Sequence, residues 1–260
     1  MKVLTLIFVT LAAGGFGSSP VAVSFAAGIL GFSAAPQPKP ANSPELESVL
    51  RKLDAVAANF RTAQADFEWD YYQKVIDEIV DVETGTIYYR RSGKDIEMMA
   101  NVRKSGASAD TLKPEQKYVL FSEGKIKIYT PKTDQVTVYV PGKNNGDVES
   151  YVVLGFGGSG QDLQKSFDVT YAGTEKIEGV NAAKLELVPK SEKVRNYYNK
   201  MILWVDPDKG ISVQQQFFTP QGDYRLCKYP PSSIKVNEKI GEDTFKLKTT
   251  SKTQIISPTG

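Results

Sequence analysis

Few residues in this chain could do chemistry, and their types exclude the commonest catalytic sets. The 260-residue sequence contains no histidine, so histidine-based triads, imidazole zinc sites and a histidine general base are excluded. Its one cysteine, Cys227, cannot form an intrachain disulfide, and a thiol without a histidine partner is a poor nucleophile. We interpret Cys227 as a buried strand residue, because free cysteine packs as a small hydrophobe.

Three acidic residues and one glycine-rich loop are the remaining candidates for a metal or phosphate site. Asp66, Glu68 and Asp70 alternate along one segment and so share a strand face, where they could bind a divalent cation. Carboxylates on the solvent face of an edge strand are commoner, and we favour that interpretation. The loop from Gly155 to Gly160 lacks the Gly-Lys-Ser/Thr ending of a phosphate loop, which favours a flexible hinge. We therefore predict no catalytic residues, no metal site and no cofactor.

The elements that must position these residues are mainly short antiparallel strands. Residues 118–140 contain three short β-type runs, separated by Glu123-Gly124 and by Pro131 to Asp134, and the second and third runs alternate strictly at 125–128 and 136–139. Period-two alternation with such breaks is typical of strands that have one buried face. Strand patterns continue to a last one near 245–249, and a sheet of about ten strands must curl or close.

One helix is expected before the strands and a second, short one between them. Ser43 or Asn42 can cap the first helix, Pro44 suits its first position, and apolar residues then recur at helical spacing up to Phe60. Residues 148–165 are apolar at first and lack alternation, which favours a short helical or irregular crossover. The fold class predicted from these patterns is mainly β with α (α+β).

The N-terminus has the pattern of an export signal. Lys2 precedes the apolar run Val3–Ala13, which is too short to span a bilayer, and small residues follow. We assign residues 1–34 to a signal peptide, with cleavage expected between 26 and 35, and residues 35–44 to a linker. An uncleaved anchor is the alternative, because residues 21–32 are also apolar. The net charge of +2 gives no general attraction to nucleic acid.

Bulky apolar side chains gather on the predicted strands, in places on both faces, as with Tyr88 and Tyr89. One interpretation is an ordinary core plus a sheet edge. The other is a curled sheet whose inner face lines an apolar cavity, roofed by the 44–60 helix, which suits acyl chains and needs no titratable catalyst. The residues expected to line that cavity are Trp69, Tyr71, Tyr89, Met98, Phe121, Tyr129, Trp204 and Phe217.

Several short motifs, in this order and spacing, resemble the periplasmic outer-membrane lipoprotein carrier proteins, the LolA-like family. The motifs are Gly85-Thr86-Ile87-Tyr88-Tyr89-Arg90-Arg91, Ser122-Glu123-Gly124-Lys125, Tyr129-Thr130-Pro131 and Leu187-Val188-Pro189-Lys190. The likeness covers roughly residues 45–250. The chain departs from the family at Ser92, where the family has a proline, and after 245–249, where it lacks a Pro-Pro pair.

The resemblance implies an unclosed antiparallel β half-barrel over residues 45–250, followed by a tail at 251–260. An N-terminal helix and a short helical crossover would form a lid over the apolar cavity. The family's functional arginine falls on Arg91, which is expected to hold this lid shut.

The function implied by the resemblance is that of a monomeric, non-enzymatic periplasmic carrier. It would shield the acyl chains of lipoproteins or related lipids, receive them from an inner-membrane lipoprotein-releasing transporter and pass them to an outer-membrane acceptor. The alternative is an envelope sensor or regulatory module of the same fold that binds a lipid or a protein segment. A hydrolase on a β-scaffold is disfavoured by the missing histidine.

Overall fold

The computed structural model of the chain describes residues 43–92, 95–140 and 154–257. The predicted signal peptide, residues 35–42 of the linker and residues 148–153 of the crossover lie outside the described residues. Within the described ranges, no helix has the length and apolar character needed to span a bilayer.

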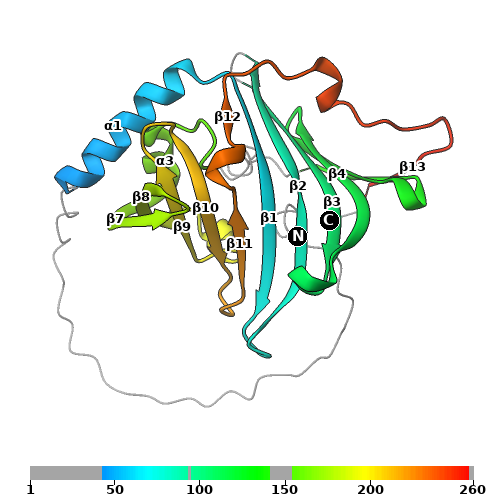
Figure 1. The fold of residues 1–260 in the computed structure, drawn as a ribbon, viewed down its shortest axis with the longest axis horizontal. Coiled ribbons are helices and arrows are strands. Elements are labelled where there is room, and N and C mark those ends of the chain that lie inside the picture. Colours follow the sequence, from blue (N-terminus) through cyan, green and yellow to red (C-terminus); the bar gives the residue numbers. More distant parts are fainter. Residues whose placement is uncertain (1–42, 93–94, 141–153, 258–260) are drawn as a thin grey trace, which may run out of the picture.

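One continuous sheet forms the body of the protein (Figure 1). Its strands follow in the order β13-β6-β5-β4-β3-β2-β1-β11-β10-β9-β8-β7, and β12 pairs with a part of β1. Because β13 and β7 end this order without pairing to each other, the sheet is not closed. All neighbouring pairs are antiparallel except β13 with β6. The bounds are β1 Thr62–Gln73, β2 Glu78–Ser92, β3 Asp95–Gly106, β4 Lys113–Ser122, β5 Lys125–Thr130, β6 Gln135–Tyr139, β7 Phe167–Ile177, β8 Val180–Pro189, β9 Lys200–Asp206, β10 Ile211–Phe218, β11 Tyr224–Lys228, β12 Lys235–Val236 and β13 Gln254–Ile256.

The described residues contain few helices, as the sequence predicted. They are α1 Pro44–Asn59, α3 Gly160–Ser166 and α4 Glu192–Arg195, with short 3-10 turns η2 Ala109–Thr111, η3 Pro131–Thr133, η4 Pro231–Ser233 and η5 Glu242–Phe245. The Ser43 side chain accepts a hydrogen bond from the Leu46 N–H (3.2 Å) and so caps α1, while Pro44 takes the first position. The predicted α+β class and the unclosed antiparallel half-barrel with helices are confirmed.

The two faces of the sheet carry separate apolar clusters. Met98 and Met99 are neighbours in β3, so their side chains point to opposite faces. Met98 belongs to the main core with the buried side of α1, whereas Met99 packs with Leu120 and Phe245 in a small second cluster. We call the face with Met98 the lid face and the face with Met99 the outer face.

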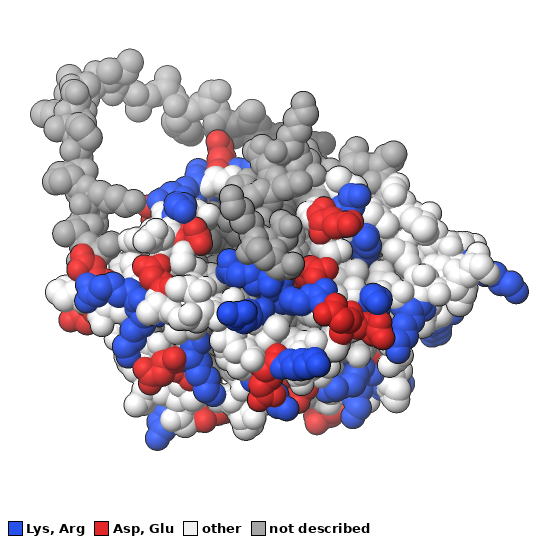
Figure 2. Space-filling view, turned by 90° about the horizontal axis from the view of Figure 1, so that it is seen from above, with Lys and Arg blue, Asp and Glu red and all other residues white. Residues whose placement is uncertain are grey.

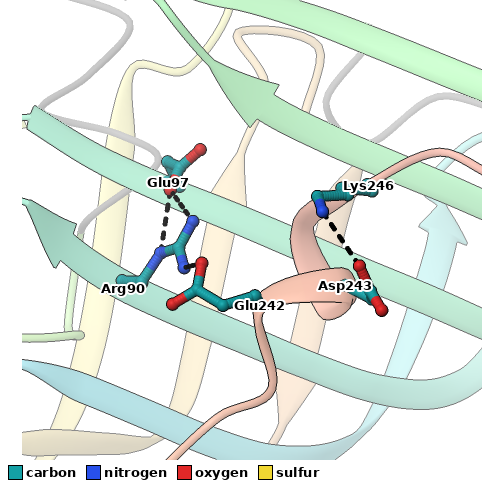
Figure 3. A network of polar contacts seen from close by, with 5 residues as sticks. All are labelled: Arg90, Glu97, Glu242, Asp243 and Lys246. Atoms are coloured by element: carbon teal, nitrogen blue, oxygen red, sulfur yellow. Dashed lines mark hydrogen bonds and ion pairs between the residues drawn. The ribbon is translucent and has the colours of Figure 1, made fainter.

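The C-terminal segment covers the second cluster, and here one prediction was wrong. Residues 245–249 do not form a strand, because Phe245 ends the turn η5 and buries its ring on the outer face. Arg90 of β2 binds both Glu97 (2.6 Å) and Glu242 (2.8 Å) (Figure 3). Its guanidinium also lies 4.5 Å from the centre of the Phe245 ring. The chain then continues to β13, so residues 254–256 are part of the sheet.

Candidate functional site

The candidate site is the lid face together with the segments that cover it. We call α1, residues 154–159 and α3 the lid. Strand pairing places Tyr89 opposite Met98, and Met98 opposite Phe121, while Trp69 lies opposite Cys227. Side chains directly opposite each other share a face, so these residues form one apolar surface. All five are buried.

The lid contacts this surface through aromatic stacking and backbone hydrogen bonds. The fully buried Phe156 ring stacks on Tyr89 (4.4 Å between ring centres) and meets the Tyr229 ring edge-on (4.9 Å). The Gln215 side-chain amide of β10 donates to the Leu154 carbonyl (2.6 Å), and the Ser212 N–H donates to the Gly155 carbonyl (2.7 Å). The lid therefore occupies the space above the lid face with its own side chains.

A glycine allows the loop before α3 to lie close to the Phe60 ring. Gly157 has φ +74°, and a Cβ added there would lie 2.3 Å from the Phe60 ring, which follows α1. A larger residue would be strained in this backbone region and would also displace the ring. Close packing against the residue that follows α1 thus accounts for glycine at position 157.

Arg91 connects the sheet to the lid. Its Nη2 donates to the Gly157 carbonyl (2.9 Å), and its guanidinium lies 6.0 Å from the centre of the Phe60 ring. Its Nε is buried and has no hydrogen-bond partner among the described residues. A hydrogen bond from Ser159 lowers the pKa of Asp162 on α3, and the Lys165 and Arg91 charges add to this. One side-chain hydrogen bond from Arg91 thus joins β2 to the loop before α3.

Charged residues occupy another part of the lid face. Arg225 lies opposite both Tyr71 and Phe217 and is only 4% exposed. Its guanidinium is 5.1 Å from the centre of the Tyr71 ring and 3.9 Å from the Asp81 carboxylate. Glu83, also buried, forms an ion pair with Lys117. Burying a charge costs free energy unless the charge has a partner. Asp81 is that partner for Arg225, and Lys117 is that partner for Glu83.

Cys227 lies on the lid face, opposite Trp69 and Gln215. It is fully buried, and burial raises the pKa of its thiol to about 12. The predicted buried, unreactive cysteine is therefore what the structure shows.

Six of the eight residues expected to line a cavity lie on the lid face, and two do not. Trp69, Tyr89, Met98, Phe121 and Phe217 are buried there, and the half-buried Tyr71 lies beside Arg225. Whether they contact a lipid stays a prediction, since in this structure they contact protein. The two exceptions are Tyr129 and Trp204.

Tyr129 and Trp204 lie on the outer face, so their placement in the cavity was wrong. Tyr129 lies opposite Tyr118, whose ring packs against the Met99 cluster, and its hydroxyl donates to Asp134 (3.2 Å). Trp204 follows Leu203, which shares the lid face with Gln215, and therefore points the other way. Its indole donates to Glu175 (2.6 Å), and Lys184 Nζ lies 5.2 Å from the ring centre.

The three alternating carboxylates each have a cationic partner. Asp66 pairs with Arg103 (3.2 Å), while Lys228 lies 2.7 Å from both Glu68 and Asp70. Asp70 is buried rather than solvated, and burial raises the pKa of its carboxyl while Lys228 opposes the shift. No group of three or more metal-binding side chains occurs in the described part of the chain. Figure 2 shows both signs of charge interspersed on the surface seen from above.

Comparison with known proteins assigns the chain to a family but leaves its activity open. A family model described as "Uncharacterized protein" matches residues 116–253, which is more than half of the chain, and the chain belongs to this family. A search of curated proteins finds no match. The architecture that the sequence predicted, an unclosed antiparallel half-barrel of the α+β class, is the one observed.

Solved structures with a similar fold include three of note. An uncharacterized conserved protein from Thermus thermophilus has 12% identity and a TM-score of 0.49, covering 82% of this chain and 99% of that one. MucB has 13% identity and a TM-score of 0.48, covering 82% of this chain. A LolA superfamily protein from Nitrosomonas europaea has 14% identity and a TM-score of 0.37, covering 78% of this chain and 97% of that one. This chain spans 66% of the length of the MucB chain. At these identities and scores the likeness says nothing of what this chain binds.

Proposed function

We propose that the protein is an exported periplasmic carrier that shields acyl chains of lipoproteins, or of related lipids, on the lid face. The observation that carries the proposal is the lid itself: a large apolar sheet face is covered by segments held through few polar contacts. Burial of acyl chain contributes about 0.8 kcal/mol per CH₂, so an acyl group needs such a surface to cross an aqueous compartment.

In this proposal, the lid fills the place of the cargo when the carrier is closed. Phe156 stands where cargo would contact Tyr89, and it lies in the lid rather than in a strand. Displacing residues 154–159 would break the hydrogen bonds to Gln215 and Ser212 and expose an apolar surface that includes Trp69 and Met98. Acyl chains would then contact the sheet in place of the lid side chains, because acyl chains and these side chains are both apolar.

Arg91 is proposed as the latch of this lid. Its single side-chain hydrogen bond to the Gly157 carbonyl is strong enough to bias closure and weak enough to be broken by cargo. Replacing it by leucine would favour the open lid. Cargo would then be accepted but passed on poorly to an acceptor, because closure no longer drives release.

Binding of an apolar fluorescent dye tests the carrier surface. The folded protein should bind one equivalent of dye saturably, and long-chain acyl lipids should displace it. A transfer assay from loaded carrier to an acceptor membrane then tests the latch, with Arg91→Leu slower than wild type. Arg90→Leu is the matched control, since Arg90 lies on the same strand but faces outward. Absence of saturable binding would leave only an ordinary core.

The second candidate function is an envelope sensor of the same fold, held at the membrane by an uncleaved N-terminus. The apolar residues 21–32 are the observation that favours it. N-terminal sequencing of the native protein distinguishes the two. A carrier should lack residues 1 to about 34, whereas an anchored sensor should retain Lys2 and stay with the membranes after osmotic shock.

A further inference from the structure

The turn between β1 and β2 exposes aliphatic side chains that the fold does not use. Val75 is 95% exposed, Ile76 52% and Ile79 41%. Together with Lys74 and Asp77 they form the end of a long hairpin, which we call the hairpin tip (residues 74–79). Figure 1 shows β1 and β2 running to this turn at the lower edge of the molecule, at the opposite end from the C-terminal end of α1. Apolar side chains gathered at such a site commonly mark an interaction surface.

The hairpin tip is held in place by the neighbouring strands. The Lys74 N–H donates to the Asp223 carboxylate (2.9 Å), just before β11. The Tyr72 and Tyr224 rings stack at 4.5 Å, and the Tyr72 hydroxyl donates to Asp77 within the turn. Asp77 adopts φ +56°, a left-handed conformation that aspartate tolerates. The aliphatic side chains are therefore presented by an ordered turn.

The shape of the hairpin tip fits a lipid surface better than a protein partner. A stable protein interface buries about 800 Å² on each side, which three aliphatic side chains at a turn do not provide. A bilayer can instead open around a small protrusion, and tyrosines such as Tyr72 and Tyr224 just behind it suit the membrane–water interface.

The charges at the hairpin tip indicate which lipids it would accept. Lys74 stands against Asp77, Glu78 and Asp223, which gives a local charge of 1 − 3 = −2. Attraction to anionic lipids is therefore not available, and the apolar contact must supply the binding. We propose that the hairpin tip inserts Val75 and Ile76 shallowly into a bilayer with net-neutral headgroups. This goes beyond the carrier proposal and does not rest on what the lid face binds.

The test uses a polarity-sensitive dye on a single introduced cysteine. Cys227 is fully buried with a raised thiol pKa, so brief labelling will modify the introduced cysteine of Val75→Cys or, as the control, of Ile255→Cys much faster than Cys227. Ile255 is 72% exposed on β13, far along the sheet from β1. Both variants keep the full chain, so tethering by the apolar N-terminal run is the same in both. Vesicles of phosphatidylcholine with a nitroxide-labelled lipid serve as the probe.

The proposal expects quenching of the label at position 75 to exceed that at position 255 by about threefold or more. Adding Ile76→Ser should remove most of this difference, and replacing a fifth of the lipid by phosphatidylglycerol should not increase it. Equal quenching at both positions would overturn the proposal. A marked increase with phosphatidylglycerol would also overturn it, as would a blue shift at position 75 that depends on protein concentration without vesicles.

Discussion

The two faces of the sheet are covered by different means. On the lid face, α1, residues 154–159 and α3 cover a large apolar surface and are joined to the rest of the fold by a few hydrogen bonds, among them Arg91–Gly157, and by the exposed ion pair of Lys52 with Asp208. On the outer face, the C-terminal segment packs Phe245 against the buried Met99 and Leu120, and it is fixed by the Arg90–Glu242 ion pair and by strand pairing at β12 and β13.

The difference separates two kinds of stability. The outer covering depends on charge pairs and strand pairing that no apolar ligand could replace, so it should stay in place. The lid depends mainly on apolar contacts, which an acyl chain can replace one for one. The lid face, which has the larger apolar surface, is thus the face where cargo could take the place of the covering segments.

The largest expected effect is that of Phe156→Ala in the lid. This ring is fully buried between Tyr89 and Tyr229, and truncating a buried phenylalanine costs about 3–5 kcal/mol. Urea unfolding followed by circular dichroism should show this loss. A change below about 1 kcal/mol would mean that the lid does not pack on the sheet as described.

A smaller effect is expected for Phe245→Ala on the outer face. The ring is buried, but apart from Met99 and Leu120 its neighbours in the cluster are only partly buried, so the site can relax and the cost should be about 1–3 kcal/mol. Dye binding should stay as in wild type, because this residue does not reach the lid face. Equal losses of dye affinity in Phe156→Ala and Phe245→Ala would abolish the distinction between the faces.

The smallest effect concerns Asp134, which fixes the start of β13. Hydroxyls of Thr253, Thr250 and Tyr129 donate to its carboxylate and lower its pKa. A lowered folded-state pKa gives stability that is present above the unfolded value, near 3.8, and is lost as pH falls through the folded-state pKa. β13 should therefore detach only in acid.

Amide chemical shifts of residues 254–256, followed by NMR from neutral pH downward, measure this detachment. Asp134→Asn suits the left-handed backbone at this position (φ +44°) but removes the charge, so it should loosen β13 already at neutral pH. Identical shifts in the variant and in wild type would show that Asp134 does not hold β13.

Much of the architecture could be predicted because local patterns determine it. The cap at Ser43, the stripe from Leu46 to Leu53 and the alternation in β5 each follow from neighbouring residues, and the structure confirms them. The same alternation also predicts the face of Tyr129, because alternate residues of a strand point to the same side and Tyr129 alternates with Lys125 and Lys127. Tyr129 was nevertheless expected in the cavity because its side chain is aromatic.

Other features depend on contacts far apart in the chain and could not be predicted. Trp204 and Leu203 are both apolar, so alternation does not say which of them faces the lid. The buried Arg225 is recognised only when β11 is paired with β1 and β10. The position of Arg91 was expected from family resemblance, but its partner, the Gly157 carbonyl, emerges only from the fold.

The labelling rate of Cys227 tests the central claim most directly, because this thiol lies on the lid face and reports whether the lid opens. The native protein should react slowly with a thiol reagent, and Arg91→Leu should react about tenfold faster, as expected for the loss of roughly 1.4 kcal/mol of closure. Arg90→Leu should match wild type, and a bound long-chain acyl lipid should slow the reaction in every variant. Equal rates in Arg91→Leu and Arg90→Leu, with no protection by acyl lipid, would contradict the account.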